Sequence, residues 1–244
     1  FVQPDTGKVF SGTQTCQATA LYHGLLSPEA EARALSVLAE RIKADGGKIT
    51  CGIFGTKYLL EVLSENGMAE EAWRIVTQQE CPGWVYMLRR GATTLWEHWH
   101  FSDNIYSHNH PMFGSVSEWF YRHLAGINPC KDAVGFDKME IRPQIVGKLK
   151  WVKATYNSVR GPIAVNWQLK GQILSLEIEI PVGVSAKVFI PFRGRGIVTE
   201  GGRPYKEVPD IRCLEEKEKY VVVQVCSGHY LFKAPFKLSL IHIS

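Results

Sequence analysis

The chain has 244 residues, of which 45% are hydrophobic and 21% are charged, and its formal net charge is +4. A chain of this length and composition can bury a substantial core, which excludes an intrinsically disordered protein. The six cysteines are scattered without any Cys-x-x-Cys pair, which argues against a zinc ribbon and against a dense disulfide framework.

We therefore expect reduced, mostly buried thiols, with a single Cys213–Cys226 disulfide as the alternative. No basic segment followed by a long apolar run opens the chain, so we expect neither a signal peptide nor a membrane-spanning helix. The apolar tail at residues 238–244, LSLIHIS, is assigned no role, and its origin, native or foreign to the natural protein, stays open.

The charge is divided unevenly along the chain. Residues 1–134 hold 11 Lys+Arg and 14 Asp+Glu, a net charge of −3, whereas residues 135–244 hold 17 and 10, a net charge of +7. The composition thus changes where the predicted secondary structure also changes.

The first half of the chain is predicted to be helical. A first helix is expected within residues 13–25, where small and apolar residues recur at helical spacing. Ser27 is predicted to cap the next helix, with Pro28 at its first position and acidic residues in its first turn, where the helix dipole favours negative charge. This second helix should end at the Gly46-Gly47 pair.

Four further helices are expected before the first strand. Two of them, residues 55–67 and 68–79, are separated by Asn66-Gly67, a strong helix-ending signal. The others are predicted at about residues 93–99 and 113–124. Six helices joined in pairs by short connections are typical of repeated αα-hairpins.

From Gly135 onward the apolar period changes to about two, which predicts strands. Turn residues such as Gly161-Pro162 and Lys170-Gly171 punctuate them, as in an antiparallel sandwich. The lysines between apolar positions are expected to face solvent and protect sheet edges, so no nucleic-acid partner is predicted. The expected strands lie in the segments KMEIRP, LKWVKATYNS, PIAVNWQL, ILSLEIEIPV, SAKVFIPF, KYVVVQVCSG and HYLFKAPF.

Residues 93–110, TTLWEHWHFSDNIYSHNH, are the strongest candidate for a functional site. They place Glu97 between Trp96 and Trp99, next to a loop with four histidines. A protein core seldom holds a carboxylate between two tryptophans beside a polar loop. In the interpretation without function, Glu97 caps or forms a salt bridge, the tryptophans fill the core and the histidines face water.

A metal site is one functional interpretation of this segment. His98 and His100, then His108 and His110, form two His-x-His pairs, with Glu97 as an oxygen ligand or base. Two imidazoles two residues apart project to the same side only in extended chain, because helical neighbours meet at three and four residues apart. The helix predicted at residues 93–99 argues against this interpretation.

A carbohydrate site is the other functional interpretation. Glycoside hydrolysis uses two carboxyl groups across the scissile bond, and aromatic side chains pack on the apolar faces of sugar rings. Glu97 would be one of the two acids. Glu118 lies on a predicted helix that looks mainly structural, and no other acid near the cluster has a better claim, so the second acid is expected upstream of Phe1.

The order of motifs resembles the C-terminal portion of bacterial α-L-rhamnosidases, which are inverting glycoside hydrolases. The segments GATTLWEHW and NHPMFGSVSEW are specific in combination, and nearly the whole chain except the tail is covered. The other matching segments are GTQTCQATALYHGLL, GGKITCGIFGTKYLLEVLSENGMAEEAW, MEIRP, TYNSVRGPIAVNW and IPVGVSAKVFIP.

This resemblance implies an α-then-β fold of several domains: an (α/α)6 barrel of six helical hairpins followed by an antiparallel β-sandwich. Residues 1–134 would be the C-terminal half of the barrel, residues 135–237 the sandwich and residues 238–244 the tail. The missing N-terminal half would carry the general acid, for which this chain has no matching motif. The fragment is therefore expected to be inactive alone, to expose apolar surface and to form a homodimer or aggregate.

The resemblance also implies the roles of individual residues. Glu97 corresponds to the general base that activates water, and His110 corresponds to the histidine that contacts the rhamnose. Trp84 and Trp96 would line the pocket, with buried packing as the alternative for each, and Thr94 would orient Glu97 or cap the helix.

No cofactor or metal is implied by the resemblance. The expected partner is a rhamnose-containing glycoside or polysaccharide, with no membrane and no nucleic acid. The compartment, bacterial cytoplasm or periplasm, stays open. The loop after Glu97 is shorter than in the family and carries the additional histidines His98, His100 and His108, whose role stays open. The alternatives are a non-catalytic carbohydrate-binding module and a histidine-rich metal protein.

Overall fold

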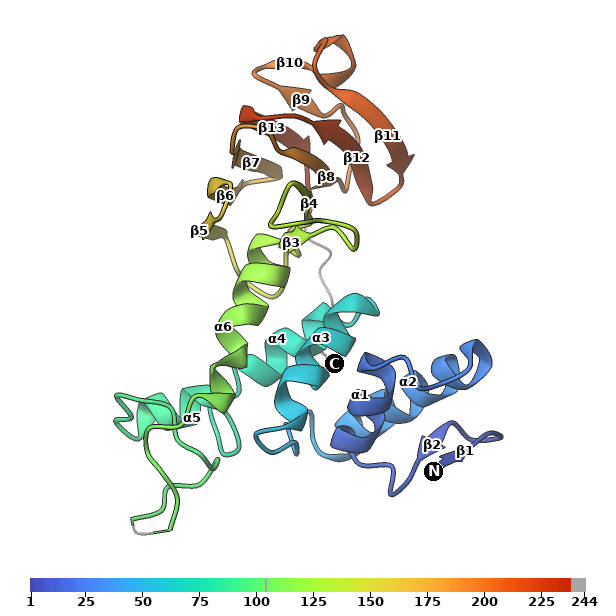
Figure 1. Ribbon diagram of the computed structural model, residues 1–244, viewed down its shortest axis with the longest axis vertical. Coiled ribbons are helices and arrows are strands. Elements are labelled where there is room, and N and C mark those ends of the chain that lie inside the picture. Colours follow the sequence, from blue (N-terminus) through green and yellow to red (C-terminus); the bar gives the residue numbers. More distant parts are fainter. Residues whose placement is uncertain (104, 238–244) are drawn as a thin grey trace. The chain divides into compact units, whose positions relative to one another are not determined.

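The computed structural model describes residues 1–103 and 105–237, and its chain divides into two compact units, Phe1–Trp119 and Phe120–Ser244 (Figure 1). The tail assigned to residues 238–244 lies outside the described residues. Within the described part of the chain, no helix combines the length and the apolar character needed to cross a membrane.

The first unit is built from helices that pack in neighbouring pairs. Helix α1 packs against α2 and α3, and α3 also packs against α4 and α6 (Figure 1). The elements are the two-residue antiparallel strands β1 (Val2–Gln3) and β2 (Lys8–Val9), helices α1 (Gln14–Tyr22), α2 (Pro28–Ala44), α3 (Gly55–Glu65), α4 (Ala69–Val76), α5 (Trp84–Arg89) and α6 (Ser115–Trp119), and the 3-10 helix η1 (Met112–Gly114).

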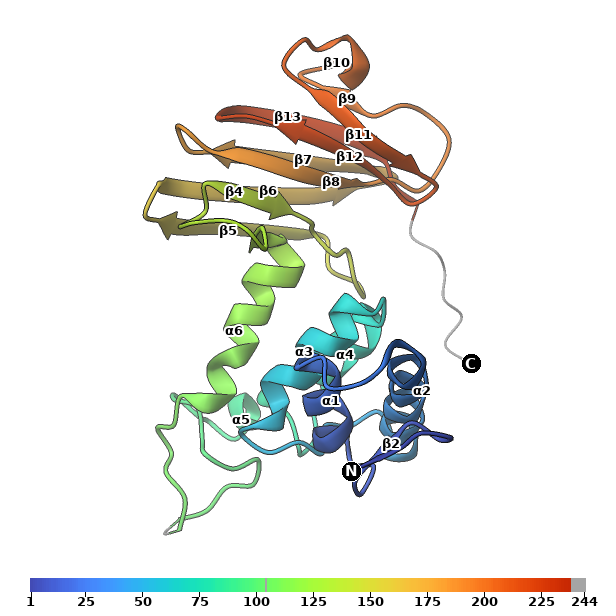
Figure 2. The same ribbon diagram turned by 45° about the vertical axis from the view of Figure 1, so that its right-hand side comes forward.

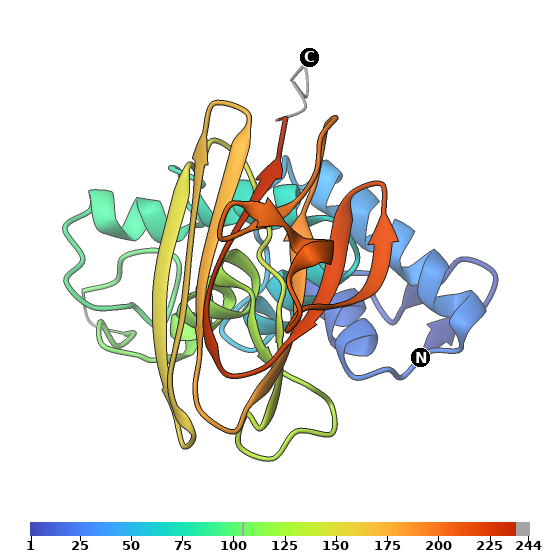
Figure 3. The same ribbon diagram turned by 90° about the horizontal axis from the view of Figure 1, so that it is seen from above.

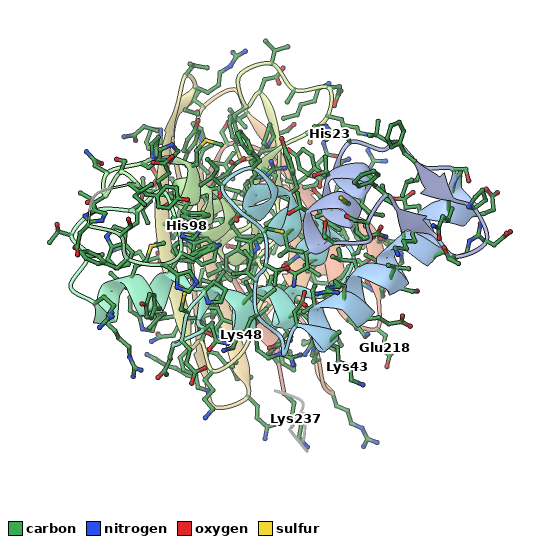
Figure 4. All side chains as sticks on the ribbon, turned by 90° about the horizontal axis from the view of Figure 1, so that it is seen from below. His23, Lys43, Lys48, His98, Glu218 and Lys237 are labelled. Carbon is green, nitrogen blue, oxygen red and sulfur yellow. The ribbon has the colours of Figure 1, made fainter. Side chains whose placement is uncertain are left out.

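The start of α2 confirms the prediction from its capping residues. The Ser27 side chain accepts a hydrogen bond from the backbone N–H of Ala30 at 3.4 Å, and Pro28 stands at the first helical position. The helix buries Leu38 and Ile42 on one face, as an amphipathic pattern requires. Its charges face solvent on the opposite side; Figure 4 shows the Lys43 side chain extending away from the α2 ribbon.

Asp45, the C-cap of α2, connects three segments of the helical unit. Its carboxylate accepts hydrogen bonds from Gln14 Nε2 at 2.8 Å, Arg41 Nε at 3.0 Å and Thr50 Oγ1 at 3.2 Å. Burial alone would raise the pKa of Asp45, but the hydrogen bonds from Arg41, Gln14 and Thr50 and the Arg41 charge outweigh it and hold the pKa below its usual value. The ionised form of Asp45 therefore stabilises the α1–α2 packing.

We expect Asp45→Asn to lower the free energy of unfolding of the helical unit by about 2 kcal/mol at neutral pH, because charged hydrogen bonds are lost. Since the folded pKa is lowered, this stabilisation is fully present above the unfolded pKa of roughly 3.9 and is lost as the pH falls through the folded value. Urea unfolding followed by the helical circular dichroism signal at neutral and acidic pH measures both effects. Glu40→Gln, at an exposed position of the same helix, is the matched control. An equal loss in the two variants would contradict this role for Asp45.

The prediction of a helix at residues 93–99 is wrong. The structure instead has α5 at Trp84–Arg89, and residues 93–99 form an irregular segment. The physical reason is that the backbone groups of Leu95 and Glu97 pair with residues 107 and 110 across a loop, rather than with residues four positions away. The run from Phe113 to Leu124 is helical as predicted, as η1, α6 and the π-helix η2 (Phe120–Ala125).

The second unit contains two sheets that share a core. The six-stranded sheet has the order β10-β9-β13-β7-β6-β5 and the five-stranded sheet the order β11-β12-β8-β4-β3 (Figure 2). The strands are β3 (Ile127–Pro129), β4 (Lys138–Ile141), β5 (Trp151–Ser158), β6 (Gly161–Lys170), β7 (Ile173–Ile180), β8 (Ser185–Pro191), β9 (Thr199–Glu200), β10 (Arg203–Pro204), β11 (Arg212–Lys217), β12 (Tyr220–Val225) and β13 (Gly228–Pro235), with the 3-10 helix η3 (Tyr205–Glu207) before β11.

The seven predicted strand segments all form strands, and one pairing differs from the expected antiparallel pattern. Strand β4 pairs with β8 in parallel, with Met139 opposite Ala186. Every other pair of named strands among the described residues is antiparallel. The parallel pair arises because β8 returns to β4 after the long β5–β7 meander rather than after a hairpin.

Alternate residues of the sheets form one apolar core, as the period of two predicts. Trp167 is 1% exposed there and donates its indole N–H to the carbonyl of Leu124 at 2.8 Å. All six cysteines are free thiols, so the Cys213–Cys226 disulfide is not formed. The expectation that the thiols are mostly buried is wrong: Cys51 is the one buried cysteine of the six, and Cys213 and Cys226 are exposed because they lie at the solvent-facing surface of the sandwich.

Candidate active site

The segment from Thr94 to Glu97 lies antiparallel to the segment from Ser107 to His110. The His110 N–H donates to the Leu95 carbonyl at 2.9 Å, and the Glu97 N–H donates to the Ser107 carbonyl at 2.9 Å. The Thr94 hydroxyl donates to the His108 carbonyl. We call these paired segments the Glu97–His110 ladder; they fix the backbones of both candidate residues at the base of the loop between them.

Glu97 is oriented by the ladder itself. Its Oε2 accepts a hydrogen bond from the Ser107 N–H at 2.9 Å, and the residue is half-buried. Together with the backbone bond between the same two residues, this contact fixes the carboxylate at one edge while leaving part of it in contact with solvent. Such a carboxylate can accept a proton from a water molecule and keep its orientation.

The tryptophans around Glu97 form two separate aromatic groups. Trp84 is 7% exposed, meets Trp99 edge-on at 5.0 Å and donates its indole N–H to the Phe113 carbonyl at 2.9 Å. Trp99 stacks on Phe113 at 3.8 Å. These contacts pack Trp84 against Trp99 and Phe113.

Trp96 belongs to the second aromatic group. It is 4% exposed, and its ring lies 5.2 Å from Phe101, 5.8 Å from His108 and 6.4 Å from Tyr86. The structure thus places the two tryptophans assigned to the pocket in packed surroundings, in two separate aromatic groups. Thr94, by contrast, is exposed and bonds to the His108 carbonyl rather than to the Glu97 carboxylate.

The four loop histidines are engaged by neighbouring protein groups. His98, labelled in Figure 4, stacks on Tyr106 at 4.8 Å, and the His100 ring lies with its Nδ1 3.4 Å from Cys81 Sγ. His108 contacts Phe101 at 4.7 Å. In residues 1–103 and 105–237, no three His, Cys, Asp or Glu side chains are grouped so that they could hold a metal ion.

His110 holds a defined ring orientation. Its Nδ1 accepts a hydrogen bond from the Met112 N–H at 3.4 Å. In a neutral imidazole, a nitrogen that accepts leaves the proton on the other nitrogen, so Nε2–H is the donor. The ladder and this turn together present that donor from a half-buried side chain.

A pocket of about 350 Å³ is lined in part by the residues that follow His110 in the chain. No sequence pattern indicated this pocket. Lys57 Nζ pairs with Glu118 Oε2 in its wall, which links α3 to α6 and gives Glu118 a structural contact. Leu95 of the ladder approaches the backbone of Gly114, another wall residue. The pocket is lined by Ile53, Phe54, Lys57, Tyr58, Pro111, Met112, Gly114, Ser115 and Glu118. The apolar period within one helix cannot indicate this pocket, because the pocket forms between the starts of α3 and α6, which lie about 60 residues apart in the chain.

Cys51 lies under the aromatic group of Trp99, whose indole N–H donates to the Cys51 carbonyl at 2.7 Å. Its side chain is fully buried, and burial raises the pKa of the Cys51 thiol to about 11. Only the thiolate form reacts with disulfide reagents.

We therefore expect Cys51 in the folded chain to react with an aromatic disulfide reagent at least about tenfold more slowly than the exposed Cys213 and Cys226 at mildly alkaline pH. Peptide mapping of the labelled thiols against time measures the difference. The Cys51→Ala variant identifies the slow signal, and labelling in denaturant should abolish the delay. Equal rates for Cys51 and Cys213 in the folded chain would contradict the burial of this thiol.

Two family models match the chain in succession. The bacterial alpha-L-rhamnosidase 6 hairpin glycosidase domain matches residues 1–124, and the bacterial alpha-L-rhamnosidase C-terminal domain matches residues 126–203. An alpha-L-rhamnosidase of Streptomyces avermitilis is 32% identical over 193 residues, which cover 76% of this chain and 18% of that protein. One from Formosa agariphila is 28% identical over 246 residues, covering 95% of this chain and 26% of that protein.

Solved structures give the same result. The structure of alpha-L-rhamnosidase from Dictyoglumus thermophilum has a TM-score of 0.84 and 38% identity, covering 93% of this chain and 26% of that one. The Streptomyces avermitilis enzyme complexed with L-rhamnose has a TM-score of 0.86 and 29% identity, covering 96% and 22%. The chain therefore spans about a quarter or less of the length of these relatives.

Proposed function

The chain belongs to the bacterial α-L-rhamnosidase family, and we propose that it is the C-terminal part of an enzyme that releases terminal α-L-rhamnose from rhamnosides with inversion at the anomeric carbon. Membership of this family confirms the resemblance seen in the sequence. It also confirms the predicted fold class, in which the helices of a six-hairpin domain are followed by a β-sandwich. The chain spans about a quarter of the length of these relatives, which supports the proposal that it is part of a longer enzyme.

The observation that carries the proposal is the half-buried Glu97 carboxylate, held by Ser107 on a ladder that also fixes His110. In the proposed reaction Glu97 takes a proton from a water molecule as that water attacks the anomeric carbon. The leaving group departs on the opposite face, where a general acid outside this chain protonates the glycosidic oxygen. An inverting enzyme places its two carboxyl groups roughly 6.5–9.5 Å apart to accommodate the water.

His110 is proposed to bind the sugar. The Nε2–H donor that follows from its contact with the Met112 N–H can donate to a rhamnose hydroxyl. Thr94 would then orient Glu97 indirectly, through the His108 carbonyl and the ladder. Trp84 and Trp96 would support the pocket wall from their packed positions rather than present open faces to the substrate.

Hydrolysis of an aryl α-L-rhamnoside by the full-length protein tests this function, with the released sugar followed by proton NMR. Inversion requires β-L-rhamnose as the first product, before mutarotation mixes the anomers. Initial release of α-L-rhamnose would contradict an inverting mechanism. An aryl β-D-glucoside serves as the control substrate, and cleavage of this glucoside without cleavage of the rhamnoside would contradict the substrate class.

A further inference from the structure

The outer face of the six-stranded sheet carries a polar surface with one large aromatic side chain. Because successive residues of a strand point to opposite faces, the residues that alternate with the buried core positions of β5, β6, β7 and β13 share this face. Its members are Trp151, Lys153 and Thr155 on β5, Ala164, Asn166, Gln168 and Lys170 on β6, Ile173, Ser175, Glu177 and Glu179 on β7, and His229, Leu231 and Lys233 on β13.

Trp151 is the feature of this face that the fold does not explain. Its side chain is 61% exposed on β5, the edge strand of the sheet (Figure 2). Trp167, one strand away, is by contrast 1% exposed in the core. Burying an indole removes a large apolar area from water and stabilises a fold, as burial of Trp167 does in the sandwich core. The exposed indole of Trp151 gives no such stabilisation. We therefore interpret Trp151 as a side chain that contacts another molecule.

The neighbours of Trp151 are hydrogen-bonding residues rather than apolar ones. Cross-strand pairing places Gln168 directly opposite Trp151, and Ser175 and Lys233 follow in the same row across β7 and β13. The successive yellow to orange strands of this sheet lie side by side in Figure 3. An indole beside amide, hydroxyl and ammonium groups suits a ligand with both an apolar face and polar edges, which is the surface of a sugar ring.

The centre of the face is held by a cross-strand network. Glu177 accepts hydrogen bonds from Asn166 Nδ2 at 3.4 Å and from His229 Nε2 at 2.9 Å. The hydrogen bonds from His229 and Asn166, with smaller contributions from the charges of His229 and Lys153, lower the pKa of Glu177. The Glu177 carboxylate is therefore already hydrogen-bonded to neighbouring strands of the sheet.

Charge divides this face into two ends. The three lysines of the outer face lie in or next to the row of Trp151 and Gln168: Lys233 is in that row, and Lys153 and Lys170 are in the rows on either side of it. Glu179 and His229 lie opposite each other at the other end, beyond Glu177. The Trp151 end is therefore the cationic end, in agreement with the net charge of +7 over residues 135–244. Since lysine is depleted in protein interfaces, this composition fits an anionic sugar better than a protein partner.

We propose that the Trp151 end of this sheet face binds an oligosaccharide that carries carboxylates, a uronate-containing chain. The indole of Trp151 packs against the C–H face of one ring, Gln168 and Ser175 bond to hydroxyls, and Lys153, Lys170 and Lys233 attract the carboxylates. This binding surface is separate from the Glu97–His110 ladder and performs no chemistry. It gives the sandwich a role in holding a polysaccharide, independently of the proposed hydrolysis.

Isothermal titration of the chain with linear trigalacturonate tests the proposal, with maltotriose as the neutral probe. We expect trigalacturonate to bind and its affinity to fall as salt rises, because charge attraction is screened. Trp151→Ala should weaken binding by at least about tenfold, since stacking and buried area are lost, whereas Trp151→Phe should retain most of it. The double variant Lys153→Gln/Lys233→Gln should weaken binding and flatten the salt dependence.

Matched controls lie on exposed positions outside this face. Val159→Ala removes an 87% exposed apolar side chain, and Lys219→Gln removes an exposed lysine next to β12; neither should change the affinity. Absence of trigalacturonate binding, or binding that Trp151→Ala leaves intact, overturns the proposal. Maltotriose binding as tight as trigalacturonate binding overturns the assignment of an anionic ligand. Because titration involves no cleavage, each of these results leaves the proposed rhamnosidase activity to be judged by its own assay.

Discussion

Replacing Glu97 by glutamine in the full-length protein should lower kcat for an aryl α-L-rhamnoside by a factor of at least about 100. Glutamine keeps an oxygen that can accept the Ser107 N–H bond, so the ladder and its geometry should survive. What the variant loses is the capacity to take a proton from water in the transition state. The loss should therefore appear mainly in kcat, while KM changes little, because the proposed sugar contact of His110 is retained.

Steady-state kinetics of the purified variant beside wild type measures this effect, and circular dichroism checks that both are folded. Asp103→Asn is the matched control: it neutralises an exposed acid on the same loop and should leave kcat within about twofold of the wild-type value. A Glu97→Gln enzyme with nearly full activity would contradict the assignment of Glu97 as the base. An equal loss in Asp103→Asn would indicate that the loop as a whole, rather than one carboxylate, controls the rate.

Many of the regular elements of this fold, although not α5, could be predicted from local sequence because local physics determines them. Ser27 and Pro28 specify the start of α2, and the alternation in residues 161–170 specifies β6 and its buried face. The parallel pairing of β4 with β8 could not be predicted, because it depends on how strands far apart in the chain meet. Strand β11 was missed because its six residues are all exposed and show no apolar alternation.

The sequence marks a candidate site in residues 93–110, but it does not predict the geometry of that segment. The aromatic and histidine content of residues 93–110 marked the region, and the family resemblance assigned Glu97 and His110 their roles. The structure shows that the segment carrying Glu97 is a ladder rather than a helix, stabilised by partners ten or more residues away. Helix propensity is summed over residues that are close in sequence, so it cannot include hydrogen bonds to partners this far away in the chain. The Lys57–Glu118 pair and its pocket were missed for the same reason.

Substituting Gly126 by alanine should destabilise the sandwich by about 3 kcal/mol or more. Gly126 has a φ of +83°, and a Cβ at this position would lie 2.2 Å from the carbonyl carbon of Arg142 and 2.3 Å from the nitrogen of Pro143. Two costs add: the left-handed backbone disfavours any side chain, and the overlap is with backbone, which cannot rotate away. Moving the backbone apart would also strain the hydrogen bond from the Arg142 N–H to the Gly126 carbonyl, now 2.9 Å.

The same substitution at Gly171 separates these two costs. Gly171 has a φ of +60° in the turn between β6 and β7, but a Cβ added there would meet no atom beyond its chain neighbours within 4 Å, so alanine should cost only about 1 kcal/mol. Native-state hydrogen exchange of the slowest β6 and β7 amides reports opening of the sandwich separately from the helical unit. Gly126→Ala should accelerate that exchange more than about 100-fold and Gly171→Ala less than about tenfold. Similar acceleration in both variants would mean that backbone conformation alone, and not the contact with residues 142 and 143, makes glycine necessary at position 126.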